Sequence, residues 1–110
     1  MRRTLLLPGL VASLAFGIAG GRATEDPLVV LTKLYRLDLA LAACSGIDAT
    51  EAEQNRLDAA IDAAERASRL DEAARQKLYD EIEAAAESDT AGFCRSEVPG
   101  LHARLETLPP

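Results

Sequence analysis

The sequence contains few of the residues that most often carry out chemistry. Its 110 residues include one histidine, two cysteines, no tryptophan, two tyrosines and two phenylalanines. A Ser-His-Asp or Cys-His catalytic set would have to use His102, which lies in a short segment beside Pro99 and Gly100. The chain has no glycine-rich phosphate loop, and a single histidine provides too few ligands for zinc. We therefore expect a non-enzymatic protein without a cofactor or catalytic residues, and a solvent-facing His102.

Positive charge is also scarce. The 12 Lys and Arg residues are outnumbered by 18 Asp and Glu residues, which gives a net charge of −6. Nucleic-acid binding needs clustered Lys and Arg to neutralise phosphates, and single strands also need aromatic side chains on which bases stack. An acidic chain is likewise not attracted to an anionic bilayer. The composition therefore argues against a nucleic-acid partner and against adsorption to membranes.

The first 23 residues have the layout of a signal peptide. Arg2 and Arg3 precede an apolar run over 5–18, and small residues stand before a cut after Ala23. The arginine pair could instead belong to a twin-arginine signal, although the residues usual around such a pair are missing. The apolar run is too short to span a membrane. We expect export to the periplasm or beyond, without membrane insertion, and a single α-helical domain over 24–110.

Removal of the signal peptide would make the chain more acidic, since it takes away three arginines and no acid and changes the net charge from −6 to −9. In the remainder, apolar residues recur at helical spacing in three segments, 27–45, 51–69 and 72–88. Each segment starts at a pattern that caps helices: Asp-Pro, a Thr-x-x-Glu capping box, and Asp. A shorter leucine stripe predicts a tail helix after Gly100. The predicted fold is all-α, an up-down-up three-helix bundle with a short C-terminal tail helix.

One alternative to two helices over 51–69 and 72–88 is a continuous helix over 51–88, because no glycine or proline interrupts the pattern there. The two cysteines help to decide between these arrangements. An exported chain with two cysteines predicts a disulfide, here between Cys44 and Cys94. A straight helix over that range would run about 57 Å and leave the cysteines far apart. An up-down-up bundle brings them to the same end. We therefore expect a break in the helix near Leu70. Because the chain has no Cys-x-x-Cys motif, we expect the bridge to be structural and not redox-active.

The segment 27–45 is apolar over an unusually wide arc. A second apolar stripe, which includes Leu28, Leu31, Tyr35 and Leu39, widens its apolar surface to roughly 220°, against about 100° for a helix that packs on one side. The surplus predicts an interaction face that binds a protein partner or a second copy of the chain, which would make a homodimer. The alternative is that this helix lies centrally and its own chain covers it.

Asp38 falls in the middle of this apolar arc. A buried carboxylate must find a partner or take up a proton. One interpretation is a hydrogen bond or ion pair with an arginine or with Tyr79. The other is a pH switch, in which protonation of Asp38 changes an interface built on this helix.

Carboxylates line the outer face of the second segment, where Asp58, Asp62 and Glu65 stack at helical spacing. Clustered carboxylates suit hard cations such as calcium. Carboxylates on one helix face point outward side by side and do not wrap an ion, however, and Asp62 has a basic partner at Arg66. We therefore expect no metal site, and a periplasmic cation-binding protein that uses these acids is an alternative function. A small inhibitor or immunity protein is a second alternative.

The plan of the chain is similar to that of the small acid-resistance chaperones of the periplasm. Both have a signal peptide, a short helical chain and one disulfide between cysteines about 50 residues apart. The likeness is one of architecture: no motif around either cysteine matches, and no residue role is carried over. The expected function is that of an exported, non-enzymatic interaction protein, acid-responsive and chaperone-like, which acts through the apolar face of the segment 27–45.

Overall fold

A computed structural model gives the structure of residues 25–109. The predicted signal peptide, residues 1–23, lies outside this range. The part of the chain that the structure describes has five helices and no strand: α2 (Pro27–Ala43), α3 (Glu51–Ser68), α4 (Glu72–Ser88), α5 (Thr90–Glu97) and α6 (Leu101–Glu106). The prediction of an all-α fold with three main helices and a short tail helix is confirmed. None of the helices within 25–109 is both long and apolar enough to cross a membrane.

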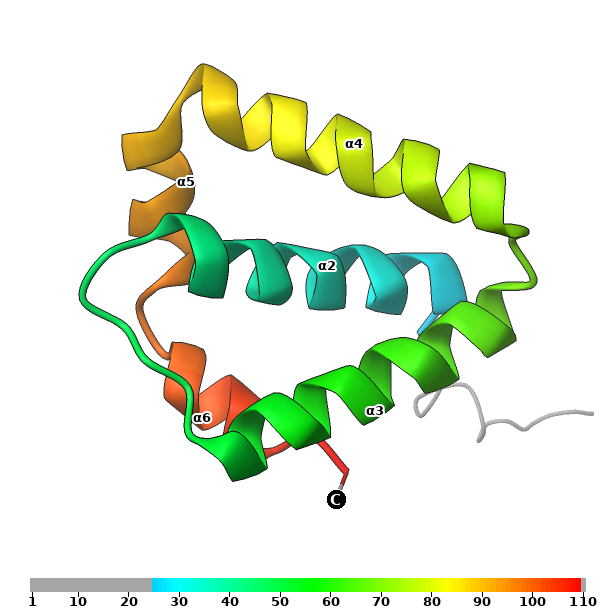
Figure 1. Ribbon diagram of the computed structural model, residues 1–110, viewed down its shortest axis with the longest axis horizontal. Helices are drawn as coiled ribbons and strands as arrows, with labels where there is room; N and C mark the ends of the chain where they lie inside the picture. The colour runs from blue at the N-terminus through cyan, green and yellow to red at the C-terminus, as the bar shows by residue number, and fades with distance from the viewer. Residues whose placement is uncertain (1–24, 110) are drawn as a thin grey trace, which may run out of the picture.

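Helix α2 is the central element of the fold. Figure 1 shows α2 between α4 and α3, which diverge away from the turn that joins them. Contacts run from α2 to α3, α4 and α5, and α6 packs on α3. With neighbours on several sides, α2 buries six of its apolar side chains, namely Leu31, Leu34, Tyr35, Leu37, Leu39 and Ala40.

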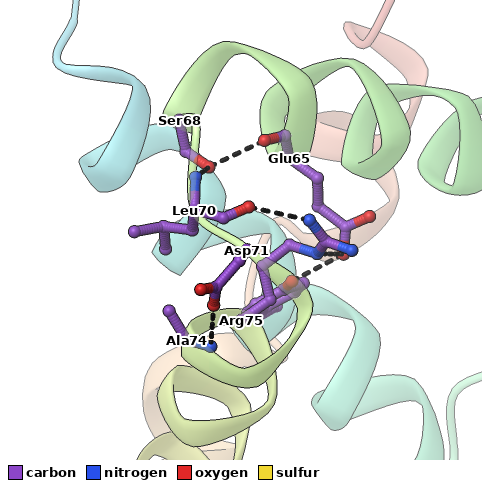
Figure 2. A network of polar contacts seen from close by, with 7 residues as sticks. Glu65, Ser68, Leu70, Asp71, Ala74 and Arg75 are labelled. Carbon is purple, nitrogen blue, oxygen red and sulfur yellow. Dashed lines mark hydrogen bonds and ion pairs between the residues drawn. The ribbon is translucent and has the colours of Figure 1, made fainter.

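A sharp turn separates α3 from α4, so the continuous helix over 51–88 does not form. Arg69 has a left-handed backbone conformation with φ 62° and ends α3. Asp71 starts α4, since its carboxylate accepts a hydrogen bond from the backbone N–H of Ala74 at 2.8 Å. The guanidinium of Arg75 donates to the carbonyl of Leu70 at 2.8 Å (Figure 2). These contacts satisfy backbone groups that a helix leaves unpaired at its ends.

The predicted disulfide between Cys44 and Cys94 is present, with a Cα–Cα distance of 5.7 Å. It joins the C-terminal end of α2 to α5. The two cysteines therefore lie at the same end of the bundle, as the up-down-up arrangement requires.

The tail helix is part of the core and not an appendage. The largest fully buried side chains are Leu31 of α2, Leu57 of α3, and Leu101 and Leu105 of α6. Two of these four come from a helix of six residues. Helix α6 therefore covers apolar surface that α2 and α3 would otherwise expose.

Candidate binding surfaces around helix α2

The predicted interaction face of α2 lies largely inside the molecule. Leu31, Tyr35 and Leu39 are at most 6% exposed, because the neighbouring helices of the same chain cover them. Of the four predicted residues, only Leu28 remains at the surface, where it is 44% exposed beside Val29 at 45%. The burial of the other three supports the alternative in which α2 is central, and corrects the expectation that they form a free surface.

Asp38 of α2 is half-buried and faces Tyr79 of α4. The tyrosine hydroxyl donates a long hydrogen bond, 3.4 Å, to Oδ2 of Asp38. Burial raises the pKa of Asp38 above its ordinary value, and the negative charge of Asp58 raises it further, while the hydrogen bond from Tyr79 acts in the opposite direction. Of the expected partners, an arginine or Tyr79, the structure therefore places Tyr79 beside Asp38.

A second polar contact ties α2 to α3 next to this pair. The hydroxyl of Tyr35 donates to Oε2 of Glu65 at 2.6 Å, and the guanidinium Nε of Arg75 lies 3.8 Å from the same oxygen. Figure 2 shows Glu65 of α3 and Arg75 of α4 pointing toward one another across the turn. The Tyr35 ring meets the ring of Tyr79 edge-on, with centroids 5.3 Å apart. Glu65 is therefore engaged inside the bundle.

The three carboxylates of the alternative cation site have separate partners. Asp58 accepts a hydrogen bond from the side-chain amide of Gln54 at 3.0 Å, Asp62 forms an ion pair with Arg66, and Glu65 turns toward α2. Within residues 25–109, no three His, Cys, Asp or Glu side chains are grouped so that they could hold a metal ion. The structure therefore provides no geometric support for the cation-binding alternative.

His102 connects α6 to the start of α3. Its Nδ1 lies 3.1 Å from Oε2 of Glu53, whose side chain is only 9% exposed. Glu53 also accepts a hydrogen bond from the backbone N–H of Thr50 at 2.9 Å, and this contact completes the predicted capping box. The pKa of Glu53 is lowered below its ordinary value, chiefly by the hydrogen bond from the Thr50 N–H and further by His102. The imidazole is half-exposed, so the expectation of a purely solvent-facing tail histidine missed this contact.

A groove lies between α2 and the segment after α5, and we call it the α2–α6 groove. Its volume is about 540 Å³. Its apolar lining consists of four aliphatic side chains, two of which are buried and two partly buried. These are Leu34 and Leu37, which are buried, and Val30 and Leu108, which are partly buried.

Charged side chains surround the apolar lining of the α2–α6 groove. Nε of Arg36 lies 2.7 Å from Oε2 of the buried Glu97, and Nη1 of Arg104 lies 3.3 Å from Oε1 of the same carboxylate. Lys33 pairs with Glu25 at 2.6 Å, and both of these side chains are exposed. Three of the nine Lys and Arg residues that follow position 23 thus lie at this one groove.

Sequence reasoning did not find the α2–α6 groove. Helical periodicity identifies the apolar positions of α2 but not which neighbour covers each of them. The groove arises because α6 packs on α3 and the chain then passes along α2, a contact between segments far apart in the sequence. The one available signal was the leucine stripe of the tail, which indicated that the tail packs on something.

Comparison with known proteins assigns no function to these surfaces. The chain matches no protein-family model, no curated protein and no solved structure.

Proposed function

We propose that this protein is a small, exported, non-enzymatic binding protein that holds a partner against the uncovered side of α2. The α2–α6 groove is the observation that supports this proposal, because it combines an apolar lining with convergent charged groups. The exposed Leu28 and Val29 extend the apolar surface at the N-terminal end of the same helix. The partner is a protein or a second copy of this chain.

The disulfide supports the exported part of the proposal. Disulfides persist in oxidising compartments and are rare in the reducing cytosol. The bridge between Cys44 and Cys94 agrees with the signal-peptide layout of the first 23 residues. We therefore propose that the protein acts in the periplasm or outside the cell.

An acid response is part of the proposal, and the contact between Glu53 and His102 supports it. This contact holds α6 on α3, and Arg104, Thr107 and Leu108 of the same tail form one wall of the groove. Protonation of Glu53 removes the charge that His102 faces, so acid loosens α6 and exposes apolar surface. Protonation of Asp38 acts in the opposite sense, since it relieves the cost of a buried charge. We therefore place the acid-sensitive contact of this proposal between α6 and α3.

Site-specific cross-linking tests the proposal. A photoreactive amino acid is placed at Val29, which is exposed beside the groove, and in a matched protein at Ala73, which is exposed on α4. Irradiation of the cells that make the protein is expected to give a discrete adduct from position 29 and none from position 73. Absence of an adduct at position 29, or the same adducts from both positions, would contradict the proposal.

A further inference from the structure

We infer that the α2–α6 groove binds a single-chain aliphatic carboxylate, that is, a fatty acid. This inference concerns the same groove as the proposed function but goes beyond it, because it assigns a small-molecule ligand class that does not depend on a protein partner. It depends on three features of the groove: its net positive charge within an acidic protein, its aliphatic lining, and the hydrogen-bond donors that its two arginines retain.

The charge of the groove suits an anionic head group. Lys33, Arg36 and Arg104 provide three positive charges against the two negative charges of Glu25 and Glu97. The chain after position 23 carries a net charge of −9, so this region has the opposite sign to the molecule as a whole. A region of net positive charge attracts an anionic ligand more than the acidic remainder of the surface does.

The two arginines at the groove retain hydrogen-bond donors for a ligand. A guanidinium has five N–H groups in a fixed planar fork. Arg36 reaches Glu97 through Nε and stacks over the Phe93 ring at 5.0 Å, which fixes the orientation of its plane. Arg104 binds both the carboxylate and the backbone carbonyl of Glu97. A ligand carboxylate can therefore join the two guanidinium groups without displacing the buried Glu97.

The remaining lining suits an aliphatic chain better than a peptide. Val30, Leu34, Leu37 and Leu108 present only hydrocarbon, and the volume of about 540 Å³ falls within the range usual for small-molecule sites. A peptide would bring backbone N–H and C=O groups that need partners when they are buried. Apart from its charged groups, Thr107 is the only polar side chain in the lining.

Decanoate is the probe for the test, used at neutral pH and below its micelle concentration. Amide shifts of the labelled protein are followed in two-dimensional NMR spectra during titration with decanoate, with a neutral amphiphile of the same chain length, and with acetate. We expect saturable decanoate shifts confined to α2, to residues next to Glu25 and Glu97, and to residues after 100. The neutral amphiphile should bind at least about tenfold more weakly, and acetate should not bind. Absence of localised decanoate shifts, or equal binding of the neutral amphiphile, would overturn the inference.

Three variants connect the binding to the groove. Lys33→Gln removes an exposed groove cation and should weaken decanoate binding about two- to fivefold, as expected for a solvent-exposed charge contact. Val30→Asp places a carboxylate against the lining and should abolish binding. Lys77→Gln, on the exposed surface of α4, is the matched control and should bind as the unchanged protein does. Unchanged binding by both groove variants would overturn the inference.

The outcome is distinguishable from failure of the proposed function. If decanoate does not bind while the position 29 adduct persists and Val30→Asp removes it, the groove holds a protein partner and the ligand class is wrong. If decanoate binds as expected and no adduct forms, the protein partner is wrong. If decanoate does not bind and no adduct forms at position 29, both proposals are contradicted.

Discussion

Protonation of two carboxylates, Asp38 and Glu53, changes the stability of the folded protein in opposite directions. The pKa of Asp38 is raised, chiefly by burial, so the folded protein takes up this proton more readily than the unfolded chain does and gains stability as pH falls through that pKa. The pKa of Glu53 is lowered by its contacts with Thr50 and His102. The stability that Glu53 contributes is therefore fully present above the ordinary carboxyl range and is lost as pH falls through its lowered pKa.

The substitution Asp38→Asn is expected to stabilise the protein at pH 7. The amide removes a half-buried charge and can still accept the hydrogen bond from Tyr79. Because Asp38 is partly exposed to solvent, we expect a gain below about 1 kcal/mol. The gain should vanish in acid, where Asp38 is already protonated. Urea denaturation at both pH values measures it, with the exposed Asp80→Asn as control. A clear loss of stability at pH 7 that is specific to Asp38→Asn would contradict this explanation.

The substitution Glu53→Gln is expected to flatten the acid dependence of stability. Glutamine can still serve in the capping box but offers no charge to His102. As pH falls below the ordinary carboxyl range, the unchanged protein should lose stability and bind more of an apolar dye, whereas the variant should change less over the same interval. Glu51→Gln, at an exposed position in the same first turn of α3, is the control. Superimposable pH curves for the two variants and the parent would exclude Glu53 as the acid-sensitive group.

At the scale of elements, local sequence signals predicted most helix boundaries. The observed helices Pro27–Ala43, Glu51–Ser68 and Glu72–Ser88 end within two residues of the predicted 27–45, 51–69 and 72–88. Caps determine these limits through contacts over two or three residues, and such contacts can be read from sequence.

Helix α5 was not predicted as a separate element. It is eight residues long, too short to show clear periodicity, and it starts directly after α4. Asp89 ends α4 and also caps α5, where its Oδ1 accepts a hydrogen bond from the backbone N–H of Gly92 at 3.0 Å. The same residue therefore ends one helix and starts the next, so no gap in the sequence marks α5 as a separate element.

The role of the apolar positions on α2 could not be decided from its sequence. Periodicity established that Leu31, Tyr35 and Leu39 avoid water but not whether the chain or a partner covers them. The answer depends on where α3, α4 and α5 pack, which involves contacts across tens of residues. The tail contacts of Glu53 and Glu97 were missed for the same reason.

The capping box at the start of α3 supports the next prediction. Thr50→Ala removes the side-chain oxygen that accepts a hydrogen bond from the backbone N–H of Glu53 at 3.1 Å. The loss should be about 1 kcal/mol in the free energy of unfolding, measured by urea denaturation. Thr32→Ala is the control, because the exposed Thr32 donates to a helical carbonyl and caps nothing. Equal effects of the two substitutions would contradict a capping role for Thr50.

At the scale of the whole molecule, the disulfide compensates for a small core. The described part of the chain is short, and small domains bury a smaller share of their surface than large ones do. The bridge spans 50 residues, and closing a loop of that length removes about 4 kcal/mol of unfolded-chain entropy.

Replacement of both cysteines tests this contribution. The double variant Cys44→Ala, Cys94→Ala should lose about 2–5 kcal/mol in the free energy of unfolding and remain helical at low temperature. Urea denaturation followed by circular dichroism measures both properties, with the unchanged protein in reductant as a second route to the open form. A change below about 1 kcal/mol by either route would show that the core is sufficient without the bridge.

Native mass spectrometry shows directly whether the uncovered side of α2 holds a partner. The protein and its Val30→Asp variant are recovered from the producing cells without reductant, detergent or denaturant. The unchanged protein is expected to carry a stoichiometric added mass, from a second copy, another protein or a small ligand, and the variant to have lost it. A bare monomer, or the same added mass on both proteins, would contradict the proposed function.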